Sequence, residues 1–181
     1  MSVAAVLLAA GLSRRFGDED KLQMLLDGMP LGLHAARTLS ALPLDHRIVV
    51  TRQNSLDWPD FTRVINYQPE IGMGHSLALG VRSACQMGAD AVLVALADMP
   101  FVPLEHFAAL LARHRGAASV IASSSGTQRM PPALFGRDWF ERLESLTGDA
   151  GARTLLTDAD TVAAKGAELV DIDSAGDLTG R

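Results

Sequence analysis

Apolar residues in this chain fall into two patterns, one typical of buried strands and one typical of helices. Uninterrupted apolar runs of six residues occur at 3–8 and 91–96. Such runs predict strands that are covered on both faces, as in the parallel sheets of α/β proteins. Shorter β-branched runs at 47–51 and 63–66 predict two further strands.

Helical spacing alternates with these strands. Apolar residues recur every three or four positions from Leu31 to Leu42, and Pro43 ends the pattern. Further helices are predicted after residue 76 and over 104–114, 139–146 and 151–156, strands over 119–122 and 168–172, and a loop over 127–132. The alternation predicts an α/β fold of three layers around a mostly parallel sheet, in a single domain spanning 1–181.

Composition narrows the class of protein. The 181 residues are 48% hydrophobic and 20% charged, with 16 basic and 21 acidic residues and a net charge of −5. The negative balance argues against a nucleic-acid partner. The lone cysteine, Cys85, cannot form an internal disulfide, which is typical of a reducing compartment. No apolar run has the length of a membrane span, so we expect a cytoplasmic protein without a membrane partner.

The loop after the first strand has the chemistry of an anion site. Gly11 and Gly17 enclose a serine and two arginines, and Lys21 follows. Glycine permits close backbone approach, exposed N–H groups donate, and cations neutralise charge. The glycine spacing fits neither the dinucleotide fingerprint nor the P-loop. The loop is therefore a candidate phosphate site of another kind, with a solvated surface loop as the alternative.

A carboxylate follows the second long apolar strand. Asp98 stands two residues after the run at 91–96, where α/β sheets place their ligands. If the first loop holds phosphates, a carboxylate beside them requires a cation between them, and Mg²⁺ takes such ligands. The alternative is that Asp98 only caps the turn at Pro100. Together with the loop at Gly11, a metal site is the preferred interpretation.

Five segments in order resemble those of the MobA-like nucleotidyltransferases, closest to the molybdenum cofactor cytidylyltransferases. They are Leu8-Ala9-Ala10-Gly11 with Ser13, Arg15, Gly17 and Lys21; Gly72-Met73-Gly74 with Ser76-Leu77; Asp98 with Pro100-Phe101; Gly148-Asp149 with Gly151-Ala152-Arg153; and Asp171-Ile172-Asp173-Ser174. The resemblance covers nearly the whole chain.

The resemblance implies a Rossmann-like nucleotidyltransferase fold of the GT-A type. It implies transfer of a nucleoside monophosphate from CTP, or GTP, to a molybdopterin-type cofactor, with Mg²⁺ as cofactor. A molybdoenzyme or its chaperone is the further partner that it suggests. The implied nucleotide-binding residues are Leu8, Ala9, Ala10, Gly11, Ser13, Arg15, Lys21, Gly72, Gly74 and Ser76. Arg15, Lys21 and Asp98 are the implied catalytic residues, Asp98 and Asp173 the metal ligands, and Arg129, Asp149 and Arg153 the acceptor-binding residues.

Two positions concern the choice of nucleotide base and the identity of the acceptor. Ala10 stands where the guanylyl branch of the family has glycine, which favours CTP. Met130 stands where the family usually has a glycine near the acceptor, so the acceptor is less closely specified than the nucleotide.

Other interpretations remain open. Ser76 also fits an N-cap, Ser174 with Asp177 a capping box, and Arg153 a partner for Asp149. At the level of the whole protein, the alternatives are a guanylyl or sugar-phosphate transferase, an NAD(P)H-dependent reductase of a small heteroaromatic compound, and a non-catalytic cofactor chaperone. The missing dinucleotide fingerprint argues against the reductase.

Overall fold

The protein is built around one large twisted sheet. The computed structural model describes residues 1–12, 20–53, 55–149 and 151–173. Within them the sheet has the strand order β5-β4-β1-β6-β8-β7-β9. Its strands are β1 (Val3–Ala9), β4 (His46–Thr51), β5 (Thr62–Ile65), β6 (Ala91–Leu96), β7 (Val120–Ser125), β8 (Gln128–Gly136) and β9 (Asp160–Ala163). β5, β4, β1 and β6 run parallel, β8 is antiparallel to both of its neighbours, and β9 is parallel to β7. The predicted mostly parallel α/β sheet is confirmed.

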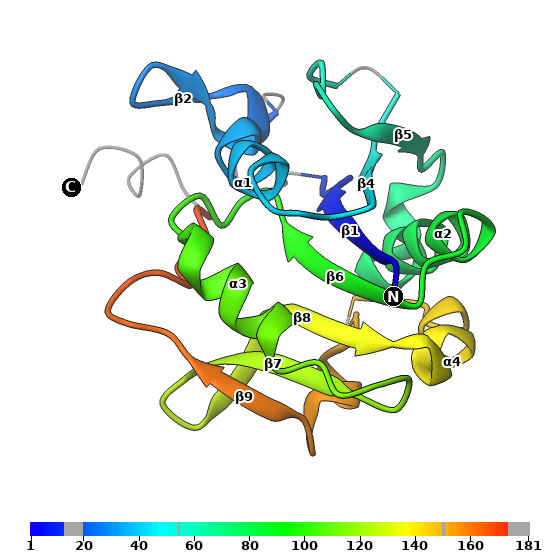
Figure 1. Cartoon of the computed structure of the whole chain (residues 1–181). Helices are drawn as coiled ribbons and strands as arrows, with labels where there is room; N and C mark the ends of the chain where they lie inside the picture. The colour runs from blue at the N-terminus through cyan, green and yellow to red at the C-terminus, as the bar shows by residue number, and fades with distance from the viewer. Residues whose placement is uncertain (13–19, 54, 150, 174–181) are drawn as a thin grey trace.

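Helices cover both faces of the sheet (Figure 1). One face carries α1 (Leu31–Ser40) and α3 (Leu104–Ala112), and the other carries α2 (Met73–Gln86) and α4 (Phe140–Glu144). Along β1, Ala5 and Leu7 join the first core, whereas Val6 and Leu8 join the second. Both faces of β1 are therefore buried, which is why its sequence lacks polar alternation.

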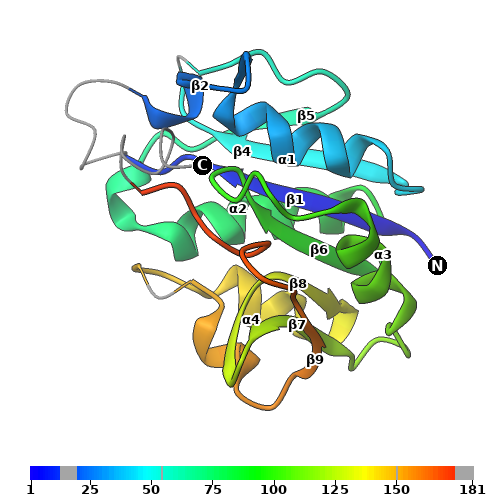
Figure 2. The same cartoon turned by 90° about the vertical axis from the view of Figure 1, so that its left-hand side faces the viewer.

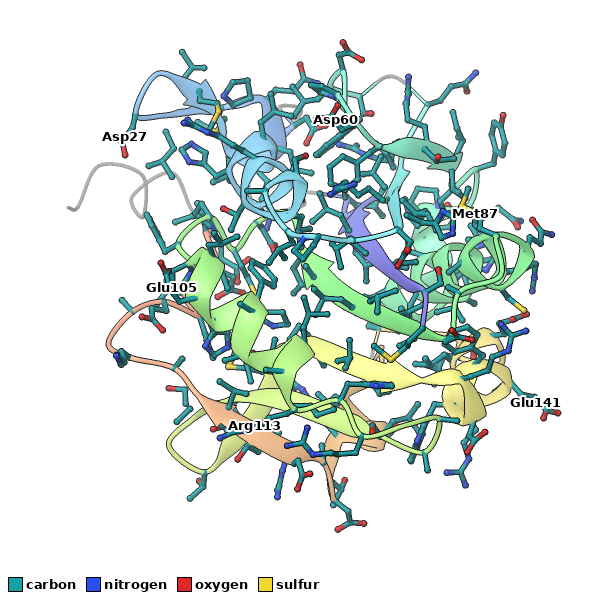
Figure 3. The ribbon with its side chains drawn as sticks, in the orientation of Figure 1. Asp27, Asp60, Met87, Glu105, Arg113 and Glu141 are labelled. Atoms are coloured by element: carbon teal, nitrogen blue, oxygen red, sulfur yellow. The ribbon has the colours of Figure 1, made fainter. Side chains whose placement is uncertain are left out.

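Short elements complete the fold. β2 (Leu25–Leu26) and β3 (Met29–Pro30) form a hairpin whose turn residues, Asp27 and Gly28, both have positive φ. Figure 3 shows Asp27 at the tip of this hairpin. The 3₁₀ turns are η2 (Lys21–Gln23), η3 (Pro69–Ile71), η4 (Arg137–Trp139) and η5 (Arg153–Leu156). A helix with the length and apolar character of a membrane span does not occur in the described ranges.

The prediction of a loop over 127–132 is wrong. These residues belong largely to β8, which lies between β6 and β7. Proline argues against a central strand because it lacks the N–H donor. Here Pro131 and Pro132 fall at an irregularity, since the pairing with β7 passes from Met130 directly to Ala133. The bulge accommodates both prolines inside the sheet.

The predictions for the last third also need correction. The predicted strand over 168–172 does not form. Leu169 and Ile172 are buried, but the segment has an irregular backbone and no strand pairing (Figure 2). The last strand is β9 instead, in which only Val162 is buried. A strand with one buried side chain has almost no hydrophobic pattern to detect. The helix predicted over 151–156 is reduced to the turn η5.

Candidate functional site

A cavity of about 410 Å³ lies where β1 and β6 end. Their carboxyl ends meet because the two strands are parallel neighbours, with Leu8 paired to Leu96. The sequence-predicted residues that line it are Leu8, Ala9, Ala10, Gly11, Lys21, Gly72, Ser76, Asp98, Asp149 and Asp173. The fold therefore gathers residues from both ends of the chain into one concave site, the usual place for a ligand in such sheets.

Lys21 is surrounded by oxygen atoms. Its Nζ lies 2.7 Å from Asp98 Oδ2, 3.4 Å from Asp173 Oδ1 and 3.1 Å from the carbonyl oxygen of Ile172. Burial by itself would lower the pKa of this ammonium, but Asp98 and Asp173 oppose that effect and the pKa is raised. The side chain is therefore a charged cation at the site.

Local capping sets the position of Lys21. Asp20 accepts a hydrogen bond from the backbone N–H of Leu22 and so begins the turn η2. Arg52, directly after β4, holds the other carboxylate oxygen of Asp20 at 2.7 Å. These two contacts fix Asp20, and the side chain of the following residue, Lys21, is directed to Asp98.

Backbone contacts hold Asp98 and the C-terminal segment together. The N–H of Ala97 donates to the carbonyl of Leu8, and the N–H of Ile172 donates to the carbonyl of Asp98 at 2.9 Å. The second bond brings Asp171 and Asp173 to the site, although they lie outside any strand. Burial, and then repulsion from Asp173, raises the pKa of Asp171. Negative charge is thus concentrated around one ammonium.

The donor set suits a hard cation. Two carboxylates and one carbonyl oxygen converge on Lys21 Nζ, and oxygen ligands of this kind are those that Mg²⁺ takes. In the described part of the chain, no group of three or more His, Cys, Asp or Glu side chains forms a metal cage. Mg²⁺ commonly uses one or two protein carboxylates, with waters and substrate phosphates as its other ligands. Asp98 and Asp173 fit that mode.

Two glycines bring the start of α2 against the loop 147–149. Gly74 donates its N–H to the carbonyl of Gly148 at 2.8 Å. Gly72 has φ +110°, and a Cβ there would lie 2.5 Å from the carbonyl carbon of Gly148 and 2.6 Å from Asp149 Oδ1. The contact requires glycine for space and for backbone conformation. It also places Asp149 at the cavity.

Gly72→Ala is expected to destabilise the protein and to weaken ligand binding at the cavity. The matched control is Gly88→Ala, because Gly88 also has positive φ (+80°) but a Cβ there meets nothing within 4 Å. Both variants strain the backbone, but Gly72 (φ 110°, ψ 178°) also lies in a region that essentially only glycine adopts, so we expect Gly72→Ala to lose about 1–3 kcal/mol more free energy of unfolding through overpacking and strain together. Chemical denaturation measures this difference. Equal losses in the two variants would show that the contact with residues 148–149 is unimportant.

Ser76 does not cap its helix. α2 begins at Met73, with Gly72 as its N-cap, so Ser76 lies inside the helix and the N-cap interpretation is wrong. Its side chain is buried, and its Oγ accepts a hydrogen bond from Asn66 Nδ2 at 2.9 Å. Sequence reasoning did not select Asn66, because a single polar residue at a strand end carries no motif. The proximity to Ser76 arises only from the packing of α2 beside β5.

Other predicted residues lie elsewhere. Gly74 does not line the cavity itself but contacts the loop that does. Arg129 donates to the carbonyl of Ala159 and Arg153 is exposed at the start of η5; neither lines the cavity. Ser13, Arg15, Ser174 and Asp177 lie outside the described residues.

Comparison with known proteins agrees with this architecture. Residues 5–163 match the family model described as the MobA-like NTP transferase domain. The chain also superposes on a nucleotidyl transferase from Methanothermobacter with a TM-score of 0.84, 24% sequence identity, and coverage of 99% of this chain and 95% of that one. The likeness of the two structures shows a common fold.

Relatives by sequence include a purine catabolism protein and molybdenum cofactor guanylyltransferases. The purine catabolism protein PucB of Bacillus subtilis is 38% identical, over 83% of this chain and 78% of that protein. A molybdenum cofactor guanylyltransferase of Shewanella frigidimarina is 27% identical, over 84% of this chain and 78% of the guanylyltransferase.

Proposed function

The chain belongs to the MobA-like NTP transferase domain family, and we propose that it transfers CMP from CTP to the terminal phosphate of a molybdopterin-type cofactor. The single observation that carries this proposal is the convergence of residues 9–12, Lys21 and Asp98 on one cavity. A triphosphate brought there meets backbone N–H groups, a fixed ammonium and carboxylates able to hold its metal.

The reaction needs positioning more than acid–base chemistry. An oxygen of the acceptor phosphate bonds to the α-phosphorus of the nucleotide, the bond from that phosphorus to the β-phosphate oxygen breaks, and pyrophosphate leaves. The attacking phosphate is already largely ionised near neutral pH, so the site needs no general base. Phosphoryl transfer enzymes work mainly by holding reactants in line and neutralising charge.

Each residue then has a role. The backbone of Ala9 to Leu12 orients the phosphates, and Lys21 neutralises the charge that develops on the leaving pyrophosphate. Asp98, with Asp173, would hold Mg²⁺, which when bound would neutralise negative charge on the nucleotide phosphates. Arg15 is proposed as a second cation for the phosphates.

The position of Asp149 suggests where the pterin acceptor binds. This residue lines the cavity, whereas Arg129 is engaged with the carbonyl of Ala159. We therefore assign the pterin to the side of the loop 147–149, with Arg153 beyond it. We further propose a molybdoenzyme as the recipient of the finished cofactor, and the name of the relative PucB, a purine catabolism protein, favours one that acts in purine catabolism.

Guanylyl transfer is the second candidate. The curated name of the relative at 27% identity favours it. Ala10, in place of the glycine of the guanylyl branch, favours CTP.

Pyrophosphate release tests the proposal. Protein, Mg²⁺ and molybdopterin-type cofactor are mixed with each of the four nucleoside triphosphates in turn, and a parallel set omits the cofactor. We expect pyrophosphate with CTP, much less with GTP, and none without the cofactor. A larger signal with GTP would move the assignment to guanylyl transfer. No release with any nucleotide, despite binding of the pterin, would indicate a cofactor chaperone.

A further inference from the structure

Asn66 is fixed in one orientation at the end of β5. Its side chain is almost fully buried, at 2% exposure, and its backbone N–H donates to the carbonyl of Thr51 at 2.8 Å. Its Oδ1 accepts a hydrogen bond from the backbone N–H of Gln68, also at 2.8 Å. A backbone N–H can only donate, so the oxygen of the amide must face Gln68 and the amide nitrogen must face Ser76.

This orientation determines the role of the Ser76 hydroxyl. A hydroxyl has one proton, and the Ser76 oxygen already accepts from Asn66 Nδ2 at 2.9 Å. Its own proton therefore points to another acceptor. Serine within a helix commonly donates to a carbonyl one turn earlier. Within the described ranges, the Ser76 hydroxyl makes no such bond, and its residue lines the cavity.

We propose that Asn66 is a positioning residue that turns the Ser76 hydroxyl proton into the cavity, where it donates to an oxygen of the bound nucleotide. The proposal rests on the proposed function, since it assumes a nucleotide in this cavity. Asn66 is not among the residues that line the cavity, so it acts through Ser76 rather than on the ligand.

Asn66→Asp reverses the hydrogen bond with little change of shape. A carboxylate still accepts from the N–H of Gln68, but it cannot donate to Ser76 and accepts the hydroxyl proton instead. The proton is then withdrawn from the cavity. Ser76→Ala removes the donor altogether. If Asn66 acts through Ser76, the effect of Asn66→Asp depends on the presence of the hydroxyl.

The experiment is a double-mutant cycle on the affinity for CTP with Mg²⁺, measured by titration calorimetry. We expect Ser76→Ala to weaken binding about three- to tenfold, the value of one hydrogen bond. We expect Asn66→Asp to weaken binding by a factor at least about three times larger in the wild-type background than in the Ser76→Ala background. The added negative charge repels the triphosphate equally in both backgrounds, so the effect of this repulsion cancels when the two factors are compared. Ser83→Ala, two turns further along α2, is the control and should leave affinity unchanged.

Thermal unfolding of each variant accompanies the cycle, and Asn66→Ala in the same two backgrounds replaces Asn66→Asp if the aspartate variant fails to fold. Equal factors in the two backgrounds, with intact nucleotide binding by the wild type, would overturn this inference and leave the proposed function standing. A wild-type protein that binds neither CTP nor GTP would overturn the proposed function and this inference with it.

Discussion

Asp98→Asn is expected to reduce turnover at ordinary Mg²⁺ by on the order of 10²- to 10³-fold, the usual cost of one electrostatic group in a transition state. The substitution keeps the shape of the side chain but removes the charge that pairs with Lys21 at 2.7 Å and that we propose as a metal ligand. Steady-state pyrophosphate release measures the effect, and a Mg²⁺ titration separates weaker metal binding from slower chemistry.

The control for this variant lies at the other end of the same strand. Asp90 precedes β6 and accepts a hydrogen bond from the backbone N–H of Ser2, far along the strand from the cavity. Asp90→Asn removes the same charge and should leave turnover near the wild-type value. A rate for Asp98→Asn as high as that of the control would exclude Asp98 from the reaction.

Lys21→Ala is expected to lower both the affinity for the triphosphate and turnover, each by about ten- to a hundredfold, in line with the loss of a hydrogen bond to a charged group. Removal of the ammonium leaves Asp98 and Asp173 without the cation between them, so the site repels the nucleotide as well as losing a contact. Initial rates over a range of CTP concentrations separate the two effects.

Lys165 provides the matched control, because it is the other lysine of the sequence and is exposed. Lys165→Ala removes the same group and should have wild-type kinetics. If Lys21→Ala also behaves as wild type, the placement of the phosphates beside η2 is wrong.

The sequence predicted the parts of the site that depend on strong local patterns. The apolar runs of β1 and β6 identify buried parallel strands, and the ligand rule for such sheets then joins the loop at Gly11 with Asp98, 87 positions later. No side-chain contact had to be known to place the Gly11 loop and Asp98 at the same edge of the sheet. The parallel pairing of β1 with β6 was the only tertiary requirement, and the structure meets it.

The remaining parts depend on packing that local patterns do not encode. β8 forms despite two prolines because a bulge takes them out of the ladder. Asp173 reaches the site on an irregular segment that one backbone bond, from Ile172 to Asp98, attaches to β6. Asn66 meets Ser76 because α2 returns beside β5. For β8 and Asn66, neither hydrophobic period nor motif carries this information, whereas Asp173 was named only through the resemblance of residues 171–174 to a family segment.

A crystal structure with Mn²⁺ and a non-hydrolysable CTP analogue would show whether Asp98 and Lys21 serve the same triphosphate. We expect a manganese anomalous peak beside the Asp98 carboxylate, with the triphosphate between Lys21 and the backbone of residues 9–12. A nucleotide bound elsewhere, or a metal without contact to Asp98, would contradict this expectation.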